Sequence, residues 1–124
     1  METPWVTIEG TCPSKSNCYR IVTVAGHASL AKTKALRDYE RAFYLQAGPL
    51  RRLDLQDLFE MEVKVFYPSM SHDLDNSLKV LLDCLQAKEV RAIRNDNRCV
   101  RITAEKFIDK ARPRVEMRLR SLEI

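Results

Sequence analysis

Two aspartates one residue apart, Asp73 and Asp75, lie near the start of the stretch SHDLDNSLKVLLDCLQAKEV at residues 71–90. Side chains two apart in an extended segment point to the same side, so these carboxylates can contact one ligand. Lys79 follows Asp75 by four residues, about 6 Å farther along a helix, and its long side chain can reach over that ligand. Carboxylate oxygens suit magnesium or manganese better than zinc. In a basic protein, this combination indicates metal-assisted phosphodiester hydrolysis.

Two further aspartates follow in the sequence. Asp83 shares a helical face with Asp75 and Lys79, but it lies about 12 Å from Asp75 along the axis, too far to share an ion. Asp96, in IRNDNRCV, immediately precedes a predicted strand. We expect a loop to bring Asp96 back beside the start of the helix, which makes it a third candidate carboxylate.

Three carboxylates held close together repel one another, and this repulsion must be offset. At 5 Å and an effective dielectric constant near 20, each pair repels by about 3 kcal/mol. The carboxylates must lie apart, or one must be protonated, or a cation must lie between them. A purely structural explanation is equally available, in which Asp73 caps the helix, Asp75 lies in its favourable first turn and Asp96 belongs to a turn. Spacing alone leaves both interpretations open.

The composition is that of one folded domain. The chain has 124 residues, of which 45% are hydrophobic and 31% charged, with three glycines and five prolines. This length predicts a single domain spanning residues 1–124 without low-complexity segments. Apolar runs are too short to span a bilayer, and METPWVTIEG lacks the basic and apolar parts of a signal peptide, so we expect a cytoplasmic protein without membrane contact. The net charge of +4 and pI near 9.0 favour a polyanionic partner.

The hydrophobic pattern predicts an α+β fold. The alternating segments WVTIEG, YRIVTV, MEVKVFYP, RCVRIT and RVEMRLR are typical of strands. SLAKTKALRDYERAFYLQA has helical spacing with Ser29 as its cap, and the stretch after Asp73 carries an apolar stripe of leucines. We expect a small mixed β-sheet with these two helices packed on one face.

The cysteines do not indicate a disulfide framework. Cys12, Cys18, Cys84 and Cys99 show no close CxxC pairing, and two of them lie in apolar segments, so we interpret them as reduced structural thiols. A zinc site formed by Cys12, Cys18, His27 and His72 is the alternative, although these residues lack the usual ligand spacing.

The motif residues resemble a known family. DLDNSLKVLLDCL followed by IRNDNRCVRITAEK is similar to the core of the RusA-type Holliday junction resolvases. In that family an Asp-x-Asp-Asn-x-x-Lys segment enters a helix with a further Asp, and an Asp-Asp pair precedes a strand ending in Lys. PSKSNCYR resembles the basic Pro-x-x-x-Asn loop of the family, and RPRVEMRLR resembles its closing strand.

The resemblance implies a set of functional residues. The catalytic, metal-binding carboxylates fall on Asp73, Asp75 and Asp96, and the essential lysine falls on Lys79. The sequence departs from the family pattern at Asn95, where the family usually has the first of two aspartates, and at 97–99, where a Ser-Gln pair is common. Basic side chains that are candidates for DNA phosphate contacts are Lys15, Arg20, Arg98 and Lys106, with Arg51, Arg52 and Arg94 as further candidates.

The resemblance also implies a function. It predicts a RusA-like endodeoxyribonuclease domain that forms a homodimer on four-way branched DNA and cuts two opposing strands in recombination and repair. Mg²⁺ is the expected cofactor, with Mn²⁺ as a substitute and without a small-molecule organic cofactor. Two alternatives stay open: a junction-binding protein that has lost cleavage, and a general nuclease acting on flaps or replication forks.

Overall fold

A mixed four-stranded sheet forms the centre of the protein. The computed structural model describes residues 1–14 and 17–122. The strands of the sheet, in spatial order, are β1 (Val6–Glu9), β6 (Arg114–Ser121), β4 (Phe59–Tyr67) and β5 (Cys99–Ile108). β4 pairs with β5 in parallel, whereas the β1–β6 and β4–β6 pairs are antiparallel. The predicted α+β class with a mixed sheet is confirmed.

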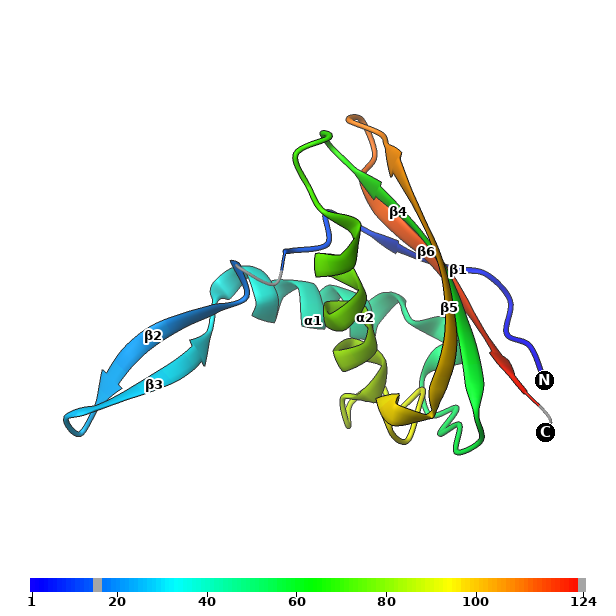
Figure 1. Cartoon of the computed structure of the whole chain (residues 1–124), viewed down its shortest axis with the longest axis horizontal. Coiled ribbons are helices and arrows are strands. Elements are labelled where there is room, and N and C mark those ends of the chain that lie inside the picture. Colours follow the sequence, from blue (N-terminus) through cyan, green and yellow to red (C-terminus); the bar gives the residue numbers. More distant parts are fainter. Residues whose placement is uncertain (15–16, 123–124) are drawn as a thin grey trace.

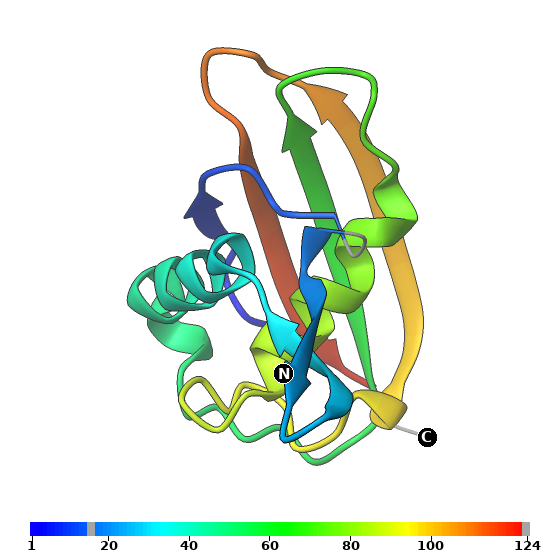
Figure 2. The same ribbon diagram turned by 90° about the vertical axis from the view of Figure 1, so that its left-hand side faces the viewer.

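The two α-helices cover one face of this sheet (Figures 1 and 2). They are α1 (Lys34–Gln46) and α2 (Leu74–Gln86). Leu36, Tyr39 and Phe43 are the buried residues of α1. In α2 the buried stripe runs along the helix through Ser77, Val80, Leu81, Cys84 and Leu85. Of the predicted leucine stripe, Leu81 and Leu85 are fully buried, whereas Leu74, Leu78 and Leu82 are only partly buried, so the buried face is rotated slightly from the predicted one.

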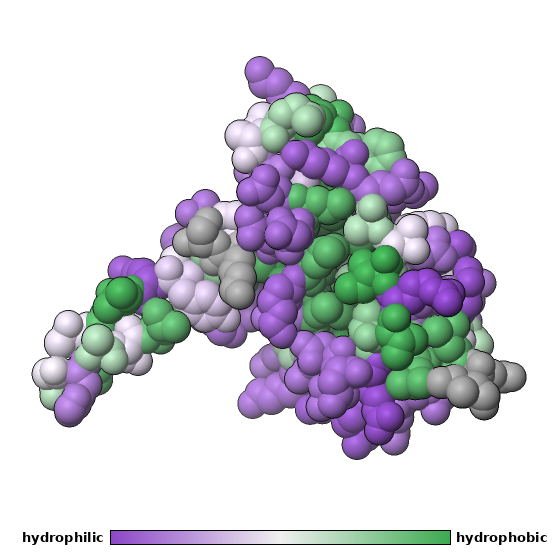
Figure 3. Space-filling view, viewed as in Figure 1, coloured by the Kyte–Doolittle hydropathy of each residue, from purple (hydrophilic) through white to green (hydrophobic). Residues whose placement is uncertain are grey.

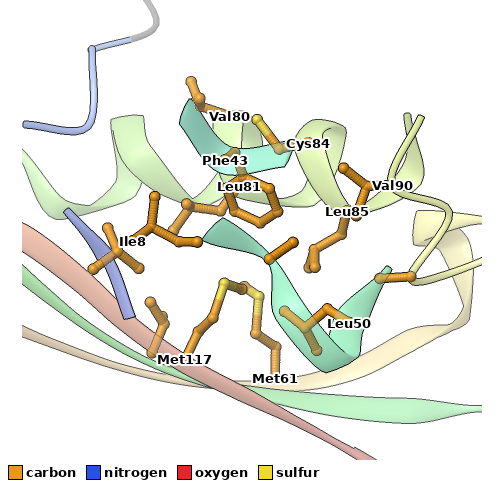
Figure 4. Packing of buried hydrophobic residues seen from close by; sticks show 14 of the residues in the cluster. Ile8, Phe43, Leu50, Met61, Val80, Leu81, Cys84, Leu85, Val90 and Met117 are labelled. Carbon is orange, nitrogen blue, oxygen red and sulfur yellow. The ribbon is translucent and has the colours of Figure 1, made fainter. Parts of the chain in front are cut away.

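Alternation along the strands separates the core from the outer face of the sheet. In β4, Met61, Val63 and Val65 are buried beneath the helices, and Met117 lies beside them in β6. Figure 4 shows Phe43 of α1 and Leu81 of α2 packed in the same cluster. Burying each such side chain contributes about 1.5–3 kcal/mol to the free energy of folding. Every second residue of β4 therefore helps to stabilise the one core under the helices.

The outer face of the sheet carries ion pairs. Arg118 contacts Glu62 across the β4–β6 pair at 3.0 Å, and Arg120 contacts Glu60 at 2.6 Å. Arg118 also lies over the ring of Trp5, 4.7 Å from its centroid. Within these pairs the opposite charges neutralise one another.

A two-stranded arm projects from the body (Figure 1). It consists of β2 (Tyr19–Val24) and β3 (His27–Lys32), paired antiparallel. The two residues that join the strands, Ala25 and Gly26, have positive φ values of 51° and 81°. A two-residue turn of this kind matches the right-handed twist of the strands, and glycine reaches positive φ without steric cost.

The arm corrects the predicted start of the first helix. Ser29, the predicted cap, lies within β3 and pairs with Val22. The helix begins at Lys34, and the Thr33 hydroxyl accepts a hydrogen bond from the backbone N–H of Leu36. Thr33 thus performs the capping function that the prediction assigned to Ser29, four residues earlier in the chain.

Apolar side chains of the arm face solvent (Figure 3). Ile21 and Leu30 are opposite one another in the β2–β3 register, and they are 76% and 70% exposed. A strand pair without a covering layer buries little area, so we infer that the arm contributes little to the stability of the core.

The cysteines occur as unpaired thiols. Cys12, Cys18 and Cys84 are buried, and Cys99 is partly buried. Burial raises the pKa of Cys12 to about 11, which keeps its thiol protonated near neutral pH. In residues 1–14 and 17–122 no three His, Cys, Asp or Glu side chains are gathered as a metal site, so the zinc alternative receives no support from their arrangement. None of the helices described is both long and apolar enough to cross a membrane.

Candidate active site

The Asp73–Asp75 pair lies where the chain leaves β4 and enters α2. Asp73 directly precedes the helix, with an extended backbone at φ −98° and ψ 129°, and Asp75 lies in the first turn. The Asp73 side chain forms no capping hydrogen bond within the described part of the chain. Both aspartates are exposed. The structural explanation of Asp73 as a side-chain cap is therefore not supported, and both carboxylates are accessible to a ligand.

The hydroxyl of Tyr67, the last residue of β4, ties this site to the sheet. It donates a hydrogen bond to the backbone carbonyl of Asp73 at 3.2 Å and pairs with the Ser77 hydroxyl at 2.5 Å. Burial raises the pKa of Tyr67, and the charges of Asp75 and Asp73 act in the same direction. The negative charges of both carboxylates thus help to keep the Tyr67 hydroxyl protonated.

Lys79 forms the centre of a second group of charges. Its Nζ lies 2.8 Å from Oδ2 of Asp96 and 3.0 Å from Oδ1 of Asp83. The hydrogen bonds to Asp96 and then to Asp83 raise the pKa of Lys79 above its ordinary value. A lysine with a raised pKa is cationic at neutral pH, so it can stabilise negative charge but cannot act as a general base there.

Lys79 is the cation that separates Asp83 from Asp96. Two carboxylates this close to one ammonium group would repel each other in its absence. The Lys79 side chain is still 52% exposed. An open pocket of ≈ 200 Å³ lies beside it, lined also by Cys18, Leu36 and Asp83. The ammonium group is therefore accessible to an anion from solvent.

The backbone of Asp96 lies beside the last residue of α2, and its side chain reaches Lys79 in the middle of the helix. It is the first residue of the short 3₁₀ helix η3 (Asp96–Arg98), and its backbone N–H donates to Oε1 of Gln86, the last residue of α2. The structure brings Asp96 to Lys79 and Asp83, but it does not bring Asp96 together with Asp73 and Asp75 as a ligand set among the described residues.

The parallel pairing of β4 and β5 explains this placement. A parallel pair requires a crossover that returns to the edge where the first strand began. Asp73 follows the carboxyl end of β4, whereas Asp96 precedes the amino end of β5, so α2 runs between them. Its 13 residues span about 20 Å. The expectation that Asp96 returns to the helix start was therefore wrong.

Comparison with known families identifies the chain. The family described as Endodeoxyribonuclease RusA matches residues 13–120. The chain belongs to the RusA endodeoxyribonuclease family. The matched region contains the candidate site residues, from the Asp73–Asp75 pair to Lys79 and Asp96. The RusA-family chain is thus a DNA endonuclease, and the predicted resemblance is confirmed. No curated protein matches it.

The basic residues predicted to contact DNA take three different positions in this RusA-family chain. Arg20 is exposed on β2 of the arm, and Arg98 is exposed in η3 next to Asp96. Neither forms an ion pair with a carboxylate in the part of the chain that the structure describes. Lys106 is half-buried and contacts backbone carbonyls of the loop before α2. Lys15 lies outside the described residues.

Sequence reasoning missed the residues that hold the candidate site in place. Tyr67 and Ser77 fix the entry to α2, and Gln86 fixes Asp96. Tyr67 is an aromatic residue in an alternating strand, and Ser77 is a small polar residue in a helix. Residues of these types are common in such elements, so their sequence positions indicate no function. Their roles depend on side-chain contacts between elements, which hydrophobic spacing does not encode.

Proposed function

We propose that this RusA-family endonuclease resolves four-way DNA junctions by magnesium-dependent hydrolysis of two opposing strands, in recombination and repair. The match to the family over residues 13–120 carries this proposal. The exposed Asp73–Asp75 pair and the nearby cationic Lys79 support it, because phosphodiester hydrolysis requires metal-binding oxygens and a positive charge at the phosphate.

The donor set at the start of α2 fits magnesium. Asp73 and Asp75 offer hard carboxylate oxygens on the protein surface, and magnesium is commonly held by one or two carboxylates with water and substrate phosphate in the other positions. We therefore assign these two residues as its ligands, with Mn²⁺ as a substitute. When bound, the ion would polarise the phosphate and lower the pKa of the attacking water.

Lys79 would stabilise the charge that develops on the scissile phosphate. It lies one helical turn beyond Asp75, its ammonium group is partly exposed, and its raised pKa keeps it cationic. Asp96 would act on this step by holding the ammonium group. Oδ2 of Asp96 contacts Lys79, so direct metal binding by Asp96, which the family resemblance implies, would use its other carboxylate oxygen.

The substrate contacts that we propose come from exposed basic side chains. Arg20 on the arm and Arg98 beside Asp96 are placed on different elements, so together they would contact phosphates on more than one part of a branched substrate. Arginine guanidinium groups bind phosphates in pairs of hydrogen bonds. Such contacts position a duplex but carry no sequence information.

A homodimer would supply the second active site. One chain carries a single Asp73–Asp75 pair, whereas paired cuts in opposing strands require two sites on one junction. A twofold arrangement of identical chains places two equivalent sites about one axis, and the centre of a four-way junction can present two equivalent strands to them.

Mixed dimers test the paired cut. Wild-type chains are mixed with Asp75→Asn chains, allowed to exchange subunits, and incubated with Mg²⁺ and a supercoiled plasmid that extrudes a cruciform. We expect nicked plasmid to accumulate at the expense of linear plasmid as the mutant fraction rises, because a mixed dimer has one competent site. A monomeric protein that yields linear plasmid without a nicked intermediate would contradict the dimer.

A further inference from the structure

Lys106 makes contacts that a DNA-binding side chain would not need. It lies near the end of β5, opposite Val65 in the β4–β5 register and on the face that the helices cover. Its ammonium group donates to the backbone carbonyl of Met70 at 3.0 Å and to that of His72 in a shorter contact. Both carbonyls belong to the loop that leads from β4 to Asp73.

The third side of the ammonium group faces an aromatic ring. Nζ of Lys106 lies 5.7 Å from the centroid of the Tyr67 ring, and the His72 ring stacks on the same tyrosine with centroids 4.9 Å apart. A lysine has three N–H donors. Two of them are directed at carbonyl oxygens, and the cation lies over a ring whose face attracts positive charge.

The contacts of Lys106 and Tyr67 hold the two peptide groups that flank Asp73. Lys106 holds the carbonyl of His72, and Tyr67 holds the carbonyl of Asp73, the next residue. Tyr67 also pairs with Ser77 in the first turns of α2. The backbone that carries Asp73 is thereby tied to β4, β5 and α2.

We propose that Lys106 is a positioning residue that fixes the loop before α2 and so sets the direction of the Asp73 carboxylate relative to Asp75. The consequence for cleavage rests on the proposed function, whereas the ordering of the loop does not. This assignment replaces the predicted phosphate contact. A misplacement of about 1 Å costs about 10²-fold in rate, so a clamp on the loop has a catalytic effect without touching the substrate.

The test compares Lys106→Met with Lys110→Met, which removes the same charge from an exposed lysine four residues later. Three quantities are measured: amide hydrogen exchange of residues 70–76, junction affinity as a function of salt, and cleavage in Mg²⁺. For Lys106→Met we expect faster exchange of these amides and a loss of about 10²-fold in cleavage, with the affinity and its salt dependence unchanged. Lys110→Met should match the wild type in all three.

A direct contact between Lys106 and a DNA phosphate predicts different results in these measurements. A lysine that contacts a phosphate contributes about 0.9 to the slope of log affinity against log salt. If Lys106→Met lowers this slope and leaves the exchange of residues 70–76 unchanged, the positioning role is wrong. If the wild-type protein does not cleave junctions, the proposed function fails, and the exchange measurement alone decides the role of Lys106.

Tyr67→Phe provides a second variant in case Lys106→Met does not fold. It removes only the hydroxyl that contacts the Asp73 carbonyl and Ser77. We expect the exchange of residues 70–76 to rise while the exchange of β4 and β6 stays slow. Unchanged exchange in this variant would overturn the clamp as a whole.

Discussion

Asp75→Asn is expected to reduce junction cleavage by about 10³-fold or more while the protein stays folded and bound to the junction. The substitution keeps the side chain's size but removes one charge from the proposed magnesium site. A metal ion supplies several kcal/mol of transition-state stabilisation, and each 1.4 kcal/mol is tenfold in rate. Because Asp75 is exposed, the melting temperature should change little. The measurement is single-turnover cleavage together with the dissociation constant of the junction.

Asp38→Asn is the matched control for this variant. Asp38 is also an exposed helical aspartate, 63% accessible and paired with Lys34 four residues away, but it lies on α1. Its cleavage rate should equal that of the wild type. Junction binding by Asp75→Asn should be retained or strengthened, because a carboxylate that faces phosphates repels them. Cleavage by Asp75→Asn near the wild-type rate would remove this residue from the mechanism.

Lys79→Met is expected to lower the cleavage rate by about 10²–10³-fold, the usual loss for one preorganised group that stabilises developing charge. The methylene chain of Lys79 is retained and its ammonium group is lost. Since this group separates Asp83 from Asp96, the variant also leaves two neighbouring carboxylates without their shared cation. The magnesium concentration at half-maximal rate should stay close to that of the wild type, because Lys79 is not a proposed ligand.

Substitutions of Asp96 and Asp83, the two carboxylates that pair with Lys79, distinguish two roles for Asp96. If Asp96 only holds the ammonium group, Asp96→Asn slows cleavage without changing the magnesium requirement, and Asp83→Asn has a smaller effect of the same kind. We expect the larger effect at Asp96, whose hydrogen bond is the largest cause of the raised pKa of Lys79. A magnesium requirement that rises in Asp96→Asn as it does in Asp75→Asn would make Asp96 a metal ligand.

The sequence predicted those elements whose side chains alternate against the core. β4 and β6 each place every second residue under the helices, as with Met61 and Met117. β2, in the uncovered arm, was predicted because YRIVTV is rich in β-branched residues, whereas HASLAK of β3 has none and was interpreted as the start of the first helix. The Ala25–Gly26 turn was the available signal, since a two-residue turn after a strand predicts a second strand.

The spacing of the candidate residues along α2 could be derived from the sequence, but the position of Asp96 could not. The Asp73–Asp75 pair and Lys79 follow one another along a single helix, so their spacing could be derived from helical geometry. Asp96 depends on the direction of β5 relative to β4. A parallel pair places Asp96 at the opposite end of the helix, and an antiparallel pair would have placed it near Asp73. Lys106 depends on the same register, which brings it beside the loop before α2.

Cleavage of a matched set of DNA substrates tests the central claim most directly. The wild-type protein is incubated with a four-way junction, a flap, a replication fork and a linear duplex of the same sequence, each with Mg²⁺ and with EDTA. We predict paired cuts in the four-way junction with Mg²⁺ and none with EDTA, and little cleavage of the other substrates. Equal cleavage of flaps and forks would indicate a general branched-DNA nuclease. Junction binding without cleavage at any magnesium concentration would contradict the proposed function.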